Sequence, residues 1–149
     1  MSEQAQKTFQ IQKIYTKNVS FESPNTPELF TTEFQPQLNV DLNVESKGLQ
    51  EGVYHVLLRV TATTKVEDKT AFLCEVEQAG IFTLVGFTEE EMGYMLGSQC
   101  PNTLFPYVRE AISDLVTKGG FPQLLLEPVN FDAMYMEHLQ AQQPSETAQ

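Results

Sequence analysis

Apolar and polar residues alternate along four stretches in the first part of the chain. Every second residue is apolar over residues 38–45 and 54–63, and a shorter run of the same kind covers residues 72–77. An earlier run over residues 9–22 alternates in the same way but slips at Lys13 and the residue after it. A period of two is typical of a β-strand with one buried face, so four strands are predicted.

The segments between these runs favour antiparallel pairing. Residues 65–69 are short and charged, as expected of a hairpin tip, and residues 46–52 form another short polar connection. Residues 23–27 contain Pro24 and Pro27, which have no amide hydrogen for a central strand, so they are expected to form a crossing loop. Four strands with one solvated face predict an antiparallel sheet.

The period changes after residue 87. Thr88 and Glu91 have the spacing of a capping box, which predicts a helix start. We expect Pro101 to end or kink that helix and Pro106 to kink the first turns of the next segment. That segment carries an apolar stripe and is expected to stop at glycines 119 and 120; the stripe consists of Leu104, Val108, Ile112 and Leu115.

The last part of the chain predicts an extended segment over residues 121–129 and a final helix from Asn130 to Leu139. Strands followed by helices indicate an α+β fold. The length of 149 residues suits one domain. We expect a flexible N-terminus over residues 1–8, a single domain over 9–140 and a disordered polar tail over 141–149.

Composition narrows the function classes. The net charge is −11, which argues against nucleic acid and against a basic patch for anionic membranes. The first residues are polar, without the apolar core of a secretory signal, and no apolar run is long enough to cross a membrane. Two cysteines without such a signal suit a reducing compartment, so a cytoplasmic protein is expected.

Catalytic and metal-binding motifs are absent from the sequence. The two histidines, His55 and His138, have no ligand at metal-binding spacing, and Cys74 and Cys100 are expected to be buried. No phosphate-binding loop, dinucleotide turn or nucleophile elbow occurs. We therefore expect no enzymatic activity, no metal and no cofactor.

Two features exceed what a plain globular domain needs. Apolar residues outnumber the positions on one buried sheet face, which leaves a well-filled core, an oligomer interface or an apolar groove as explanations. Glu75 and Glu77 project from the outer face of the sheet beside Leu73, which is expected to be exposed. This acidic surface is either an ordinary solvated face or a docking patch for a basic partner.

Four blocks of sequence resemble the SecB family of bacterial protein-export chaperones. The blocks cover residues 9–25, 71–82, 100–110 and 121–133, and the similarity extends from about Thr8 to Leu139. The resemblance implies a four-stranded antiparallel sheet with two main helices, the first of them kinked, on one face. It also implies a homotetramer built as a dimer of dimers, with these residues on the side used in tetramer contacts: Phe72, Cys74, Val76 and Gln78. We expect Gln78 to form a hydrogen bond across an interface.

The resemblance further implies a chaperone that works without ATP in the cytoplasm. Such proteins hold non-native precursors and deliver them to the motor SecA. A client groove is then expected between the crossing loop, the second strand and the last helix, with these lining residues: Phe30, Phe34, Tyr135 and Met136.

SecA is expected to dock on the outer face of the sheet, at Asn18, Glu22, Leu73 and Glu75. The family pattern often has an acid where this chain has Asn18, and Glu77 is our hypothesis for a compensating charge. The polar tail is expected to make a weak auxiliary contact with SecA. The alternative reading is an acidic oligomeric adaptor for one folded basic partner, which would need no accessible apolar groove.

Overall fold

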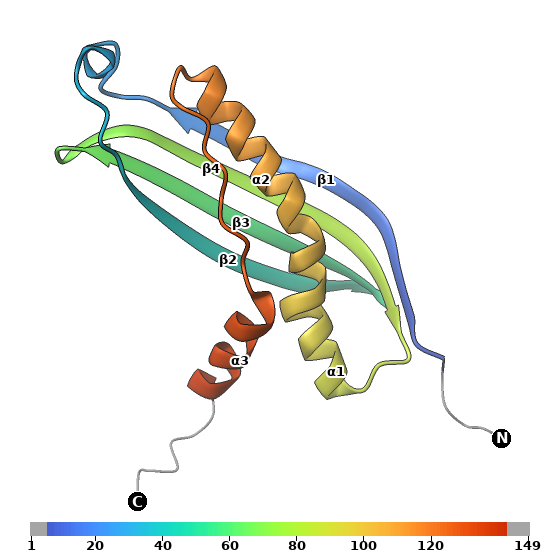
Figure 1. Ribbon diagram of the computed structural model, residues 1–149. Coiled ribbons are helices and arrows are strands. Elements are labelled where there is room, and N and C mark those ends of the chain that lie inside the picture. Colours follow the sequence, from blue (N-terminus) through green and yellow to red (C-terminus); the bar gives the residue numbers. More distant parts are fainter. Residues whose placement is uncertain (1–5, 143–149) are drawn as a thin grey trace, which may run out of the picture.

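One long, curved antiparallel sheet forms the base of the computed structural model, which describes residues 6–142 (Figure 1). Its strands are β1 (Thr8–Glu22), β2 (Gln37–Gln50), β3 (Val53–Val66) and β4 (Lys69–Val85). They are ordered β1-β4-β3-β2, with every neighbouring pair antiparallel. The predicted four-stranded sheet is confirmed, and β1 and β2 are its edges.

Both hairpins have tight turns. Between β3 and β4, Glu67 and Asp68 take positive φ angles of 51° and 69°, the conformation that matches the twist of the flanking strands. Between β2 and β3, pairing continues to Gln50 and Val53, and Gly52 turns the chain with φ of 76°. The expected loop over residues 46–52 was therefore too long, because its polar side chains are tolerated on an exposed edge strand.

Strand β1 contains two irregularities in its register with β4. They lie between Ile11 and Lys13 and between Thr16 and Asn18. Each skipped residue is a β-bulge, which places an extra residue on one strand and changes where the following side chains point. The first bulge explains the slip in the alternation that the sequence shows at Lys13.

The helical layer begins with α1 (Glu89–Tyr94), passes through a π-helical turn, η2 (Met95–Gln99), and continues as α2 (Cys100–Lys118). The predicted capping box is present: the Thr88 hydroxyl accepts from the Glu91 amide at 3.1 Å, and the Glu91 carboxylate accepts from the Thr88 amide at 2.9 Å.

Pro101 does not end the helical path, in contrast to one of the two expectations for it. The π-helical turn stands directly before it, and such a turn accommodates a residue that cannot continue the regular hydrogen-bond ladder. Pro106 also lies within α2.

Helix α2 packs across β4 and β3 and covers the inner face of the sheet (Figure 1). Its buried stripe is Leu104, Val108, Ile112 and Val116, each 0% exposed. The expected fourth member, Leu115, is only half-buried. Positions separated by four residues lie on one side of a helix, which favours Val116 over its neighbour.

After α2 the chain turns at Gly120, with φ of 92°, and residues 121–130 run back along the sheet without regular structure. We call residues 121–130 the strap. It leads to α3 (Phe131–Gln142), where the Asn130 side chain accepts from the Ala133 amide at 3.0 Å. The crossing loop between β1 and β2 contains the short helix η1 (Glu28–Thr31).

The structure describes only parts of the two chain ends that were expected to be flexible or disordered. Thr8 already belongs to β1, and the Lys7 ammonium forms an ion pair with Glu91 at 2.6 Å, although residues 1–8 were expected to be flexible. Helix α3 continues through Gln142, past the expected boundary at 140. The rest of the predicted tail, residues 143–149, lies outside the described residues.

Candidate binding surfaces on the two faces of the sheet

Two cavities lie end to end beside strand β2 on the helix-covered face. The first has a volume of about 430 Å³ and lies between β2, α3 and the α1–η2 region. The second has a volume of about 360 Å³ and lies between β2 and the strap. Leu42 lines both, so the two cavities adjoin, and we call them together the groove. The lining side chains include Leu38, Val40, Leu42, Val44, Phe105, Leu125, Leu126, Val129, Met134 and Tyr135.

The groove runs along an open edge of the sheet. Strand β2 pairs with β3 on one side, and no other described strand pairs with its free side. An edge strand offers unpaired backbone N–H and C=O groups to any extended chain that approaches it. The groove therefore combines apolar side chains with free backbone hydrogen-bonding groups.

Tyr135 forms one wall of the groove because two glycines of the opposing helix leave space for it. A methyl group at Gly97 would lie 2.6 Å from the Tyr135 ring, and one at Gly93 would collide with the phenol oxygen. The Tyr94 ring meets the Tyr135 ring edge-on at 6.1 Å. A hydrogen bond from the buried Ser98 hydroxyl to Asp132 fastens the start of α3 to η2.

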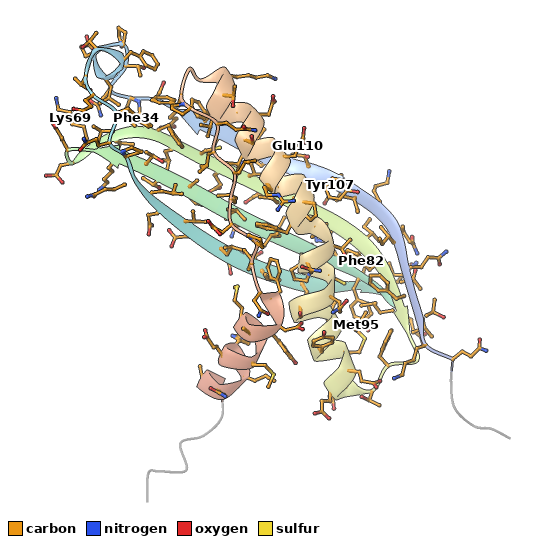
Figure 2. The ribbon with its side chains drawn as sticks, viewed as in Figure 1. Phe34, Lys69, Phe82, Met95, Tyr107 and Glu110 are labelled. Carbon is orange, nitrogen blue, oxygen red and sulfur yellow. The ribbon has the colours of Figure 1, made fainter. Side chains whose placement is uncertain are left out.

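A cluster of phenylalanines lies at the crossing loop, and none of its members lines either cavity. Phe121, the first residue of the strap, has ring centroids of Phe30, Phe34 and Phe72 within 5.2, 5.8 and 5.0 Å. Figure 2 shows Phe34 at this end of the sheet and Met95, of the π-helical turn, toward the opposite end. Phe30 remains 50% exposed.

The four predicted groove residues are thus not one contiguous set. Tyr135 lines a cavity, whereas Phe30 and Phe34 belong to the phenylalanine cluster and Met136 is 53% exposed on α3. The second strand was expected to border the groove, but none of its residues was named as a lining residue, and the strap shows no periodicity. The residues in the middle of the groove were therefore missed.

The outer face of the sheet holds the predicted docking residues together. In the pairing of β1 with β4, Asn18 lies opposite Glu77 and Glu22 lies opposite Leu73. Directly opposed residues of an antiparallel pair project from the same face. Glu75 lies between the two pairs along β4, so all five predicted residues share one surface.

The charges on this surface are not equally available. The Arg59 guanidinium donates to Glu77 at 2.8 Å and to Glu45 at 3.2 Å, and these hydrogen bonds raise the pKa of Arg59. Glu75 accepts from the Thr61 hydroxyl at 2.9 Å but has no ion pair with a described residue. Because Glu77 already forms an ion pair with Arg59, the geometry weakens our hypothesis that it compensates for Asn18.

The residues expected at the tetramer interface lie in the core of the single chain. Phe72, Cys74, Val76 and Gln78 are between 0% and 3% exposed, beneath α2. The Gln78 amide oxygen accepts from the Thr16 hydroxyl at 2.9 Å, so it has a partner within the chain, and the expected hydrogen bond across an interface stays a prediction. Any influence of these residues on assembly would act through the position of α2, and the assembly stays a prediction.

Burial also keeps both cysteine thiols protonated. Removal from water raises the pKa of Cys74 to about 11 and that of Cys100 to about 12. Both side chains are 0% exposed, as expected from the sequence. In residues 6–142 no three His, Cys, Asp or Glu side chains gather as metal ligands. None of the described helices is long and apolar enough to span a bilayer.

Comparisons with known proteins agree with this architecture. A family model described as "Preprotein translocase subunit SecB" matches residues 2–142. The "Protein-export protein SecB" of Hydrogenovibrio crunogenus is 73% identical over 146 residues, which cover 97% of this chain and 98% of the relative. The protein of the same name from Methylococcus capsulatus is 55% identical over 148 residues, covering 99% and 96%.

A solved structure shares the fold at low identity. It is a SecB-like chaperone of Mycobacterium tuberculosis in complex with an antitoxin peptide; it matches with a TM-score of 0.68 and 18% identity, over 81% of this chain and 90% of that one. With the family model and the two relatives, the conclusion follows that this chain belongs to the SecB family of protein-export chaperones.

Proposed function

We propose that this export chaperone binds non-native precursor segments in the groove beside β2 and delivers them to the motor SecA. The groove carries this proposal, because its two cavities adjoin at Leu42 and are lined by residues of the edge strand β2. Protein-export chaperone is the function of the family to which the chain belongs. We place the activity in the cytoplasm, before translocation.

The chemistry of the groove suits ligands that share no sequence. Unfolded segments have in common exposed apolar side chains and unpaired backbone groups, and the groove offers a counterpart for each. An extended segment can add to the free edge of β2 through main-chain hydrogen bonds. Met134 and Tyr135 provide adaptable apolar surface, which favours breadth over selectivity.

Exposed apolar side chains beyond the two ends of the groove enlarge the surface that we propose for client binding. Phe30 at the crossing loop and Met136 on α3 are both at least half exposed, at 50% and 53%. Phe34 packs against Phe121 of the phenylalanine cluster near Phe30. Tyr135 packs against Gly93 and Gly97, a contact that we call the glycine seat, next to Met136. A client that spans the whole length of β2 would contact all four residues, although only Tyr135 lines a cavity.

SecA docks, in our proposal, on the acidic end of the outer face. Glu22 and Glu75 have no ion-pair partner among the described residues, and Leu73 between them is 37% exposed. Unpaired carboxylates around an apolar centre suit a partner with basic side chains. Asn18 contributes a neutral contact there, and Glu77 contributes through its pair with Arg59.

A tetramer is part of the proposal, as a dimer of dimers. The supporting observation is an exposed apolar strip beside α2, formed by Phe9, Ile11 and Val19 of β1, which are 41%, 44% and 44% exposed. These side chains project from the helix-covered face, yet α2 covers mainly β4 and β3. A second copy would shield both the strip and the free edge of β1.

Native mass spectrometry with one slow-folding precursor tests the client function. The chaperone is mixed with the precursor in its denatured and in its folded form, without nucleotide, and only the denatured form is expected to bind. Capture of neither form, together with binding of a folded basic protein, would instead support the adaptor alternative.

A matched pair of variants tests the groove itself. Leu125→Asp changes a lining residue that is 65% exposed, and Leu49→Asp makes the same change at the β2–β3 hairpin, where the residue is 47% exposed. Leu125→Asp is expected to weaken client binding by about tenfold, because a charge in an apolar site loses more than 1 kcal/mol of contact. Equal client binding by both variants would contradict the groove.

A further inference from the structure

The outer face of the sheet carries a depression that shares only Glu77 with the proposed contact with SecA. Its volume is about 260 Å³, and Leu57 lies in it, only 4% exposed although its strand face is turned to solvent. All four strands contribute to its surroundings, and three of the lining side chains are cationic. The lining residues are Lys17, Glu45, Ser46, Lys47, His55, Leu57, Arg59 and Glu77.

Two lysines, one from each edge strand of the sheet, line this depression. Lys17 comes from β1 and Lys47 from β2, and both are close enough to His55 of β3 to lower its pKa, after the effect of burial. The Tyr15 hydroxyl and His55 Nε2 form a hydrogen bond of 2.7 Å, which fixes the orientation of the imidazole. Neither lysine forms an ion pair with a described residue, whereas Arg59 is shared between two carboxylates.

A β-bulge is responsible for the direction of Lys17. The register of β1 against β4 skips from Thr16 to Asn18, and Lys17 is the residue without a partner. In regular alternation Lys17 and Asn18 would project from opposite faces. With the bulge, Lys17 lines the outer-face depression next to Asn18, and re-aiming a side chain is a recurrent use of bulges at functional sites.

The outer face is therefore ordered by charge along the strands. Glu22 and Glu75 lie at one end, the ion pair of Glu77 and Arg59 follows, and His55 lies beyond it, opposite Ile81. Ile81 is six positions after Glu75 along β4, which corresponds to about 20 Å at the usual rise per residue. One folded partner can cover this distance, since a typical interface buries about 800 Å² on each side.

We propose that the two lysines and His55, which we call the lysine cradle, receive a carboxylate-bearing segment of the same folded partner whose basic residues meet Glu22 and Glu75. The reason is charge complementarity: Lys17 and Lys47 have no ion-pair partner among the described residues, and the two carboxylates of the lining are both paired with Arg59, so a carboxylate of the partner can pair with the lysines. A surface with opposite signs at its two ends also fixes the direction in which the partner lies. This inference rests on the proposed docking of SecA on the outer face.

Titration calorimetry with full-length SecA tests the cradle with two double variants of equal net charge. Lys17→Glu with Lys47→Glu reverses the cradle, and Lys69→Glu with Lys118→Glu makes the same change beside the crossing loop and at the end of α2. The cradle variant is expected to bind SecA about tenfold more weakly, which corresponds to two reversed surface contacts. The control variant is expected to bind like the wild type.

The imidazole of His55 gives an independent readout by NMR. The titratable and charged groups that surround it are Tyr15, Lys17, Glu45, Lys47, Arg59 and Glu77. A carboxylate bound between the lysines offsets their effect, so the pKa of His55 is expected to rise when SecA binds. The cradle variant is expected to show a raised pKa in the free protein already.

Three outcomes would overturn the inference. Equal affinities of the two double variants would show that only net charge matters. A rise in the pKa of His55 with inorganic phosphate alone, and none with SecA, would assign the cradle to a small anion. If wild-type SecA binding is absent, the proposed docking itself fails and the cradle inference fails with it; that result is visible before any variant is measured.

Discussion

At the scale of single residues, the width of the groove depends on how closely α3 approaches the π-helical turn. Gly93 and Gly97 allow the Tyr135 ring to lie against the helix backbone, and the hydrogen bond from Ser98 to Asp132 holds the first turn of α3 in place. Four residues separate the glycines, so they present one flat surface on the same side of the helix. One wall of the groove therefore depends on the absence of a side chain at Gly93 and Gly97.

Gly97→Ala is expected to displace α3. The new methyl group would lie 2.6 Å from the Tyr135 ring, so Tyr135 must leave its seat, at a cost of about 1–3 kcal/mol. Hydrogen exchange of the α3 amides should become faster while the sheet stays protected. Gly48→Ala is the control, since its methyl group would meet only Tyr54 at 3.9 Å. Unchanged hydrogen exchange in Gly97→Ala would show that the contact of Tyr135 with the two glycines does not hold α3 in place.

His55 links the outer face to pH. Burial, Lys47 and Lys17 lower its pKa in the folded chain, in that order of importance. The unfolded chain then binds the proton more readily, so His55 contributes stability above its ordinary pKa of about 6.5, and this contribution is lost as the pH falls through the lowered value. Lys47→Gln is expected to move the pKa of His55 upward in an NMR titration, and an unchanged pKa would show that Lys47 does not act on it.

At the scale of elements, the contact between β4 and α2 supplies the core of the chain. Cys74 on β4 and Cys100 at the start of α2 are both 0% exposed, and their raised pKa values keep the thiols protonated at neutral pH. A thiol reacts with disulfide reagents as the thiolate and only when the reagent reaches it. Both cysteines therefore report on whether α2 is seated on the sheet.

Thiol labelling at pH 8 is expected to be slow in the native protein and to involve both cysteines immediately in strong denaturant. Native labelling should follow opening of the core, because burial blocks the reagent and the pKa of about 11 for Cys74 leaves few thiolates. Leu125→Asp, at an exposed position of the strap, should leave the rate unchanged. Rapid labelling of the native wild type would show that the α2–sheet contact opens freely.

The elements differ in how far their sequence predicts them. The alternation over residues 38–45, the capping box at Thr88 and the stop at Gly119 each depend on local pattern, and the structure has each in place. Pro101 was expected to end or kink a helix, whereas the chain accommodates it with a π-helical turn that leaves no trace in the local pattern.

The candidate site was less accessible to sequence reasoning than the fold. The five outer-face residues were identified together, because alternation assigns strand residues to a face and the resemblance supplied their role. The middle of the groove was missed, since the strap has no period and its Leu125 faces β2 only after the chain has folded back. The turn of Lys17 to the outer face depends on a bulge, which simple alternation does not reveal.

At the scale of the whole molecule, the surfaces divide the proposed tasks. The groove lies beside β2, the docking face lies on the opposite side of the sheet, and the apolar strip lies at the other edge, along β1. A client, a motor and a second copy can therefore occupy separate regions of one chain. This separation suits a chaperone that must hold a client while it docks on its motor.

Ile11→Asp is expected to convert the proposed tetramer to smaller species without unfolding the chain. Ile11 is 44% exposed on the strip beside α2, so a carboxylate there remains solvated in the single chain but would be buried against a second copy. The loss amounts to about 2 kcal/mol for each copy that buries the side chain. Leu49→Asp, at a residue that is 47% exposed on the β2–β3 hairpin, is the matched control. Light scattering after size exclusion measures the molar mass of the oligomer. If Ile11→Asp has the same oligomer mass as the wild type, the strip is not the interface.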